Sequence, residues 1–411
     1  MSEVPPRVVS MDDAIERLLA TTPPRRSERV YVTRVAGRIL AEDLVARANQ
    51  PRSDVAAMDG YAVREADTVG ATPDAPVTLR IVSGSYAGAP FDGHVQPGEA
   101  AVITTGASVP EGADAIVVLE ATERDGDTVR LHQAGTSKDI RRAGEDLEVG
   151  VTTLPAGVHL DPVRLSLAAA LGHDLVPVRV APRVALIVTG SEVGSEGSRD
   201  GVFDSNGPLL TGLVTMGGGE VVSRDRIGDE PSALPDALNR ALAERPDLIV
   251  TTGGASVGQF DLVRRSMPKV DPGFDRVLVK PGSPTLLGAW EGVPWLGLPG
   301  TPVAVAVVGG TMLQAWLHAA LGRDRVSPWR NRAHAVTQRA MRGGRGKTAL
   351  WLARTWVDRA GVRQCEEVGG GGASRTWSMR DANALVVLPP DVTPEAGDVV
   401  ETVPFPLTAW R

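Results

Sequence analysis

Cysteine, lysine and aromatic residues are scarce in this sequence of 411 residues. The single cysteine, Cys365, excludes an internal disulfide and a cluster of cysteine metal ligands, and it is typical of a reducing compartment. The N-terminus has no signal-peptide pattern, so we expect a cytoplasmic protein. Only four of the 43 basic residues are lysines, which we interpret as a compositional bias of the genome.

A long run of charge of one sign is also absent. The net charge is −7 without a long acidic or basic tail, which argues against a general nucleic-acid binder. The negative net charge does not exclude binding of an anionic small molecule, because the local electrostatic field decides such binding. Residues 330–347 hold five arginines and one lysine without an acid, and form either an anion-binding rim or a solvated face. They lack interleaved aromatic residues, so we expect no nucleic-acid partner.

One apolar run is long enough to be mistaken for a membrane span. The longest, 302–321, is broken by Gly309, Gly310, Gln314 and His318, so we expect a buried core helix and no membrane contact. The hydrophobic content of 42% is enough for several buried cores and too high for a disordered chain. The length indicates roughly two to four domains.

Two helix signals frame a β-rich segment in the first 181 residues. Ser10 and Asp13 resemble a capping box, while Asp161 followed by Pro162 is a typical helix start. We expect the two helices to pack together in one discontinuous helical domain, made of 1–46 and 146–181. The segment 47–145 would then be an inserted β-rich module, because short strand patterns separated by turns fill it.

The middle of the chain alternates strand and helix patterns. This alternation over 182–326 predicts a doubly wound, largely parallel α/β sheet, and 327–411 predicts a small C-terminal β-barrel-like domain. Ligands of such sheets bind at the carboxyl ends of the strands. Those ends carry Glu192, Asp204, Gly253, Gly254, Lys280, Pro299 and Gly300, and we expect these residues to converge on one site.

One strand end combines a glycine turn with an acidic residue further along the chain. Residues 248–252 form a buried strand pattern that runs into Gly253 and Gly254, where backbone N–H groups suit a phosphate. Asp261 would repel that phosphate unless a cation lay between them, so the stretch indicates an oxyanion with a divalent metal. The alternative is an ordinary turn with Asp261 as a helix N-cap. Likewise, Asp59 sits in a turn signal and Asp146 in a cluster of solvated charges.

Eight motifs, in order along nearly the whole chain, resemble the MoeA and gephyrin E-domain family of molybdopterin molybdenumtransferases. Each motif is weak alone, but eight in family order are very specific. They are AAMDGYAV at 56–63, GEAAVITTGASVPEGADAIVVLE at 98–120, IRRAGED at 140–146, IVTGSEV at 187–193, DSNGPLL at 204–210, TTGGASVGQFD at 251–261, VKPGSP at 279–284 and GLPGTPVAV at 297–305.

The resemblance implies a reaction and an assembly. The family takes adenylylated molybdopterin and molybdate, cleaves the phosphoanhydride, inserts molybdenum at the dithiolene and releases AMP, usually with Mg²⁺. It forms homodimers whose site lies between the α/β domain of one subunit and the β module of the other. Asp59 and Thr104 would therefore reach a partner's site.

The resemblance also implies roles for particular residues. Glu192 and Asp261 would hold Mg²⁺, and Asp59 and Asp146 would act in proton transfer or metal placement. These four are the expected catalytic residues, while Lys280 would neutralise phosphates or bind molybdate. The expected substrate-binding residues are Thr104, Thr189, Gly190, Asp204, Ser205, Gly253, Gly254, Ser256, Gly258, Lys280, Ser283, Pro299, Gly300 and Arg354.

Two motifs depart from the family pattern. Ser283 stands where the family commonly has the second lysine of KPGKP, and Thr301 where it has the asparagine of GLPGNP. Both changes concern molybdate more than the pterin, so a paralogue with altered anion choice is one alternative. Others are the adenylyl-transfer step onto molybdopterin and a non-catalytic dimeric scaffold of the gephyrin E type. The intact acidic set favours an enzyme over a scaffold.

Overall fold

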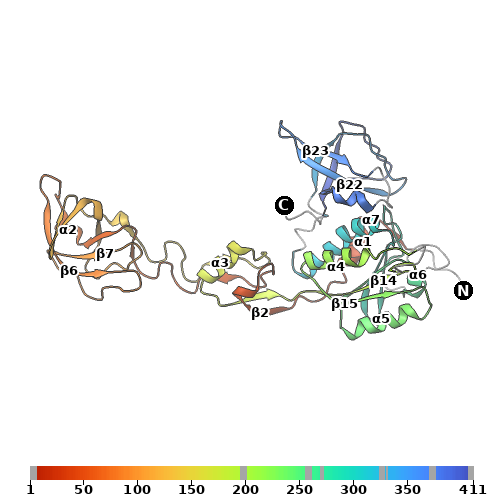
Figure 1. Cartoon of the computed structure of the whole chain (residues 1–411), viewed down its shortest axis with the longest axis horizontal. Helices are drawn as coiled ribbons and strands as arrows, with labels where there is room; N and C mark the ends of the chain where they lie inside the picture. Colours follow the sequence, from red (N-terminus) through yellow and green to blue (C-terminus); the bar gives the residue numbers. More distant parts are fainter. Residues whose placement is uncertain are drawn as a thin grey trace. The chain divides into compact units, whose positions relative to one another are not determined.

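The computed structural model describes residues 7–194, 201–254, 262–268, 273–323, 329, 332–369 and 376–405. Its contacts divide the chain into two compact units (Figure 1). One comprises Met1–Glu28 with Arg179–Arg411, and the other is Arg29–Val178. Each unit has hydrophobic clusters of its own.

A six-stranded sheet forms the larger part of the second unit. Its strand order is β8-β5-β7-β6-β10-β9, and the side chains of Tyr61, Val63, Leu79 and Val117 pack into its core. The short helix α2 (Glu65–Thr68) lies in the same region. The strands are β5 (Gly60–Val63), β6 (Val77–Ser85), β7 (Glu99–Ile103), β8 (Ala115–Val118), β9 (Thr122–Asp125) and β10 (Thr128–Leu131).

The remainder of the second unit contains helix α3 (Pro162–Ala170) and short strand pairs. Asp161 caps α3 as the sequence predicts, since its Oδ1 accepts a hydrogen bond from the N–H of Arg164 at 2.9 Å. The pairs are β2 (Ser27–Tyr31) with β13 (Leu175–Arg179), β3 (Leu44–Val45) with β12 (Thr152–Leu154), and β4 (Val55–Ala56) with β11 (Ile140–Arg141).

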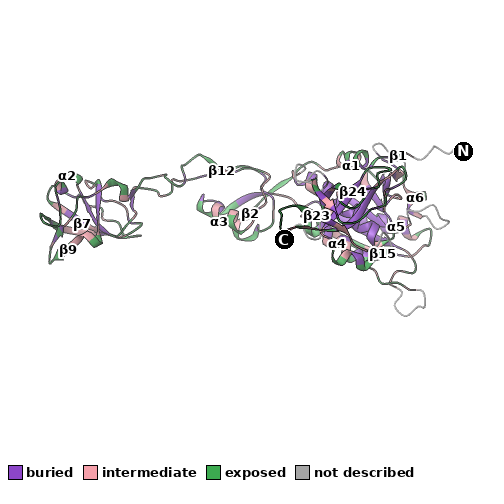
Figure 2. Cartoon of the chain, turned by 90° about the horizontal axis from the view of Figure 1, so that it is seen from above, coloured by how far each residue is buried: buried purple, intermediate pink, exposed green. Residues whose placement is uncertain are grey.

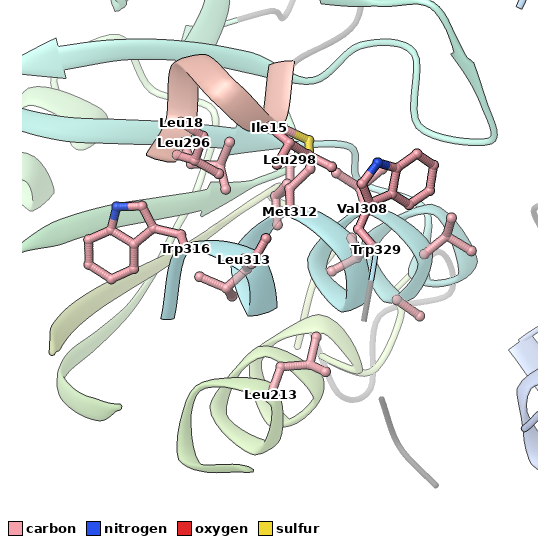
Figure 3. Close-up of a cluster of buried hydrophobic side chains, with 14 of the residues drawn as sticks. Ile15, Leu18, Leu213, Leu296, Leu298, Val308, Met312, Leu313, Trp316 and Trp329 are labelled. Atoms are coloured by element: carbon pink, nitrogen blue, oxygen red, sulfur yellow. The ribbon is translucent and has the colours of Figure 1, made fainter. Parts of the chain in front are cut away.

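The expected packing of the two N-terminal helices on each other is wrong. Helix α1 (Met11–Leu19) buries Ile15 and Leu18 in the core of the α/β domain, beside Leu298 and Met312 (Figure 3). Helix α3 instead contributes Ala168 to a separate core. Helical periodicity reveals an apolar face but not the core that covers it, which explains the error. The boundaries proposed from the sequence, near residues 46, 146, 181 and 326, remain predictions.

The centre of the first unit is a five-stranded sheet with the order β15-β14-β16-β20-β19. The first four strands are parallel and β19 is antiparallel, so the predicted doubly wound sheet is confirmed. The strands are β14 (Arg183–Thr189), β15 (Glu220–Ile227), β16 (Leu248–Thr252), β19 (Leu286–Trp290) and β20 (Val293–Leu298).

Helices cover both faces of this sheet. Alternate residues of β14 divide between two cores: Leu186 belongs to the core with α4, α7 and α8, and Ile187 to the core with α5 and α6. Buried residues fill this domain (Figure 2). The helices are α4 (Asn206–Met216), α5 (Ala233–Ala243), α6 (Leu262–Ser266), α7 (Pro302–Val308) and α8 (Gln314–Ala320).

The apolar stretch beginning at Pro302 is a core helix, as predicted. Helices α7 and α8 are joined by a π-helical turn, Gly309–Leu313. The stretch is long and apolar enough to cross a membrane, but 94% of its most apolar window is buried inside the domain. A Cβ on Gly309 would lie 3.0 Å from Leu213 Cδ1, so the glycine permits close packing against α4.

Five strands close into the predicted C-terminal barrel, in the order β22-β23-β21-β25-β24 with β24 pairing back to β22. They are β21 (Ala333–Thr337), β22 (Thr348–Val357), β23 (Arg363–Glu367), β24 (Ala384–Leu388) and β25 (Val399–Pro404). Two further short strands lie within 276–280. β17 (Arg276–Val277) pairs with β1 (Val8–Val9), whereas β18 (Val279–Lys280) pairs with β22 of the barrel.

Candidate functional site

Three strand ends meet at the carboxyl edge of the central sheet, as the sequence predicts. Thr252, the last residue of β16, donates its hydroxyl hydrogen bond to Pro299 O at 2.7 Å. Gly253 N donates to Leu298 O at 3.2 Å, and Thr189 Oγ1 donates to Thr252 O at 3.3 Å. These bonds bring β14, β16 and β20 together, and with them the strand-end residues that follow.

Glycine is required at this edge for two reasons. Gly253 has a φ of +92° and Gly254 a φ of +56°, which most other residues adopt only with strain. A Cβ on Gly253 would also lie 2.5 Å from Thr189 Oγ1. The missing side chain of Gly253 therefore lets Thr189 pack directly against this backbone, so that the ends of β14 and β16 approach closely.

Asn206 connects the ends of β16 and β20 by hydrogen bonds. The sequence analysis did not single it out. Its Nδ2 donates to Gly300 O at 2.8 Å and to Thr252 Oγ1 at 3.1 Å. The side chain is buried, and its Oδ1 has no hydrogen-bond partner among the described residues. The available signal was its place in the DSNGPLL motif, two residues before Pro208 in the first turn of a helix.

Asp204 and Ser205 precede helix α4. Asp204 Oδ1 accepts from Gly207 N at 2.7 Å, and Oδ2 pairs with Arg224 Nη2 at 2.8 Å. Oδ1 thus caps the helix and Oδ2 forms an ion pair with Arg224, so Asp204 has a structural role beside the site. Ser205 lies at the N-cap position, where its side chain makes no capping hydrogen bond.

Glu192 is exposed in the turn after β14. Its carboxylate lies over Gly190, whose added Cβ would meet Glu192 Oε2 at 2.7 Å. Among the described residues no group of three or more His, Cys, Asp or Glu side chains could hold a metal. Asp261, Ser256 and Gly258 lie outside the described residues, so the pairing of Glu192 with Asp261 stays a prediction.

In the β module, Asp59 holds the turn that contains Thr104. Its Oδ1 accepts from Thr105 N at 2.6 Å and from Thr105 Oγ1 at 2.8 Å. The backbone bond, followed by the side-chain bond, lowers the pKa of the Asp59 carboxyl below its ordinary value. Asp59 is therefore a carboxylate at neutral pH, suited to attract a cation more than to accept a proton.

Asp146 is exposed in the loop 138–150, and its N–H donates to Gln50 O. This loop is more ordered than a solvated charge cluster. Arg142 Nη1 pairs with Asp54 Oδ2 at 2.5 Å, and Asp54 Oδ1 accepts from Ala143 N at 2.9 Å. The bond from Ala143, with a contribution from Arg142, lowers the pKa of Asp54. The sequence analysis missed Asp54 because its partners are 88 residues or more away.

A second feature is a cavity of about 260 Å³ beside the C-terminal barrel. We call the strand ends around Gly253, Gly254 and Gly300 the glycine edge. Lys280 and Ser283 line the cavity and not the glycine edge, because β18 pairs with β22. Pro299 lines it too. The lining residues are Val279, Lys280, Pro281, Gly282, Ser283, Pro284, Pro299, Thr301, Val303, Ala304, Lys347, Leu350, Trp351, Leu352, Glu367, Val368 and Ser378.

Polar groups within this cavity come from both domains of the first unit. Lys280 Nζ lies 5.5 Å from the centre of the Trp351 ring, a cation–π distance. Lys347 Nζ donates to Ser283 Oγ at 3.3 Å. Sequence analysis missed Lys347 and Trp351, although the basic run 330–347 ends on this lysine. Arg354 is not among the lining residues and lies 5.4 Å from the Trp356 ring centre.

Comparison with known proteins identifies the family to which the chain belongs. Three family profiles match in order: the MoeA N-terminal region (domain I and II) at 9–172, a probable molybdopterin binding domain at 185–319, and the MoeA C-terminal region (domain IV) at 334–405. The chain is 36% identical over 377 residues to molybdopterin molybdenumtransferase 2 of Mycobacterium tuberculosis, covering 88% of this chain and 91% of that protein.

Two further relatives extend over almost the whole chain. The molybdopterin molybdenumtransferase of Haemophilus influenzae is 29% identical over 408 residues, covering 97% of this chain and 99% of that protein. A solved structure of the molybdopterin biosynthesis MoeA protein from Pyrococcus horikosii matches with a TM-score of 0.83 and 27% identity. That match covers 97% of this chain and 99% of the other.

Proposed function

Since the chain belongs to the MoeA family of molybdopterin molybdenumtransferases, we propose that it inserts molybdenum from molybdate into adenylylated molybdopterin and releases AMP. It is accordingly a transferase of molybdenum cofactor biosynthesis. One observation carries the proposal: relatives with this activity in their names match the chain over most of its length.

The glycine edge supplies the phosphate site of this proposal. The substrate carries a diphosphate, and Gly253 and Gly254 place main-chain groups without side chains at the end of β16. Backbone N–H groups at a strand end before a helix bind such anions without a charged side chain. Asn206 keeps Gly300 and Thr252 in place and so positions this edge.

We include Mg²⁺ as cofactor, held by Glu192 and Asp261. Magnesium commonly takes one or two carboxylates and completes its shell with water and substrate phosphates, so a cluster of three acids is not required. Glu192 fits, because its carboxylate is exposed beside Gly190 at the same sheet edge. When bound, the ion would neutralise charge on the phosphates of the substrate.

The cavity at Lys280 is the proposed molybdate site. It places an ammonium group and the Ser283 hydroxyl in a space of about 260 Å³. Pro299 lines this cavity and accepts the hydrogen bond from Thr252 at the glycine edge. The two features therefore share one segment, and the molybdate site adjoins the phosphate site.

The assembly and location complete the proposal. We propose a cytoplasmic homodimer in which Asp59, Thr104 and Asp146 of one subunit act at the site of the other. The ionised Asp59 would then attract a cation or a protonated group. Sedimentation of the purified chain tests the dimer, and a monomer at micromolar concentration would contradict it.

AMP release tests the activity. The full chain is incubated with adenylylated molybdopterin, molybdate and Mg²⁺, and the product is offered to an apo-molybdoenzyme. We expect AMP and an activated enzyme from the wild type, and a loss of both in Glu192→Ala and Asp261→Ala. Glu244→Ala, another exposed glutamate, is the matched control. No AMP from the wild type would overturn the proposed function, and normal turnover by both site variants would overturn the metal assignment.

A second candidate is the same transfer with a different anion choice. It is favoured by Ser283 and Thr301, which both line the molybdate cavity where the family commonly has other residues. Competition of molybdate against tungstate in the AMP assay decides between the two. A preference for tungstate would support altered choice, and a preference for molybdate would contradict it.

A further inference from the structure

The cavity beside the barrel is lined by charged side chains of both signs. Among the described residues that line it, the charged ones are Lys280, Lys347 and Glu367. Molybdate is a dianion, and the Glu367 carboxylate disfavours it. Of these three side chains, Lys280 and Glu367 together carry no net charge, and Lys347 makes their sum positive.

The pairing of β18 with β22 brings both lysines to the cavity. Strands β18 and β22 are parallel, and Lys280 is paired with Ala349. Lys347 immediately precedes β22, two residues before Ala349. Both residues line the cavity.

Lys347 is also held at the position of Ser283. Its Nζ donates to Ser283 Oγ at 3.3 Å, while that hydroxyl donates to Val277 O at 2.9 Å. The serine hydroxyl is thereby fixed as an acceptor for the lysine. An ammonium from the barrel consequently stands where a side chain at residue 283 would reach the cavity.

We infer that Lys347 is the second cationic residue of the oxyanion site, supplying from the barrel the charge that residue 283 does not carry. The inference rests on the proposed function for the identity of the anion. It makes Lys347 a specificity-determining residue for a tetrahedral dianion. It also explains how the site retains anion affinity with serine at position 283.

Binding without the pterin tests this role directly. Titration calorimetry with sodium molybdate is performed on the full chain and on Lys347→Ala. We expect the dissociation constant to rise about tenfold to a hundredfold, as for loss of a hydrogen bond to a charged group. Lys138→Ala, which removes an exposed lysine from the other unit, is the matched control and should bind as the wild type does. Unchanged binding by Lys347→Ala would overturn the inference.

A rescue experiment separates charge from structure. Ser283→Lys in the Lys347→Ala background returns an ammonium to the same place, so we expect affinity to recover to within about threefold of the wild type. Failure of the rescue in a protein with an unchanged melting temperature would overturn the idea that the two positions are equivalent. Glu367→Gln should bind molybdate more tightly, and weaker binding would contradict the charge argument.

The outcomes distinguish this inference from the proposed function. A wild type that releases AMP and binds molybdate, with Lys347→Ala unchanged in both, retains the function and removes the role of Lys347. A wild type that binds no molybdate at millimolar concentration removes the cavity as the oxyanion site and the inference with it. AMP release measured on the same sample shows whether the transferase activity survives that result.

Discussion

The glycine edge of the central sheet and the cavity beside the barrel are neighbouring features built in opposite ways. At the edge, Thr252 and Asn206 are buried and bonded to backbone carbonyls, and the backbone itself is constrained. In the cavity, Lys280 is exposed and Lys347 half-buried, on a lining that includes several apolar residues. The edge is therefore part of the fold, whereas the two lysines of the cavity are not in its core and can change more freely.

This difference indicates where the two features tolerate substitution. A substitution at the glycine edge breaks hydrogen bonds or introduces a steric clash. It therefore lowers the free energy of unfolding, whatever its effect on the reaction. A change in the cavity alters charge at little structural cost. The two departures from the family pattern, Ser283 and Thr301, both line the cavity, which fits this contrast.

Gly253→Ala should produce the largest effect on stability. The new Cβ would lie 2.5 Å from Thr189 Oγ1, at a residue with a φ of +92°. We expect the free energy of unfolding to fall by about 2–4 kcal/mol from strain and clash together. Urea denaturation measures it. Gly292→Ala is the matched control, with a φ of +83° and no atom within 4 Å, and should lose only about 1 kcal/mol. Equal losses would show that the close approach has no role.

Asn206→Ala should have the next largest effect. It removes the donor to Gly300 O at 2.8 Å and to Thr252 Oγ1 at 3.1 Å, and leaves buried acceptors without this partner. We expect a loss of about 1–3 kcal/mol in the free energy of unfolding, measured by denaturation. Asn239→Ala breaks an exposed bond to Trp290 and should cost under about 0.5 kcal/mol. A loss at Asn206 no larger than this control would contradict the locking role.

Asp59→Asn extends the contrast to the β module and depends on pH. The bonds from Thr105 lower the pKa of Asp59 below 3.8, its value without them. The stabilisation by the carboxylate is therefore present above about pH 3.8 and is lost as the pH falls through the lower folded pKa. We expect the wild type to melt at a higher temperature than Asp59→Asn at neutral pH.

The pH profile itself is the measurement for Asp59. The difference in melting temperature should shrink as the pH falls below 3.8 and should be constant from pH 5 to 7. Asp92→Asn, at an exposed aspartate of the same module, is the control. A difference between wild type and Asp59→Asn that is independent of pH would show that the turn is not held by the charged form.

Much of this molecule was predictable from local sequence patterns. The run at Leu248–Thr252 is short, apolar and β-branched, and the structure confirms it as a strand of a parallel sheet. The gathering of Gly253 and Gly300 followed from their places after such strands. Each of these inferences needed only the residues adjacent to it in sequence.

Long-range pairing explains the features that could not be predicted. Periodicity gave α1 an apolar face but not its partners in the α/β core. Lys280 belongs to the barrel cavity because β18 pairs with β22, which begins 68 residues after it at Thr348. No local pattern specifies that pairing, and Lys347 could not be linked to Ser283 without it.

Lys280→Ala should have the smallest effect on stability and thereby sharpen the contrast between the two features. Lys280 is exposed, and its contact is a cation–π approach to Trp351 at 5.5 Å. We expect the free energy of unfolding to change by less than about 0.5 kcal/mol, because substitutions of exposed residues rarely cost more. Molybdate affinity should nevertheless fall about tenfold or more, since an ammonium that faces the anion is lost. Urea denaturation and calorimetry on the same preparation measure both quantities. A destabilisation comparable to that of Asn206→Ala would mean that the cavity, like the glycine edge, is part of what holds the fold together.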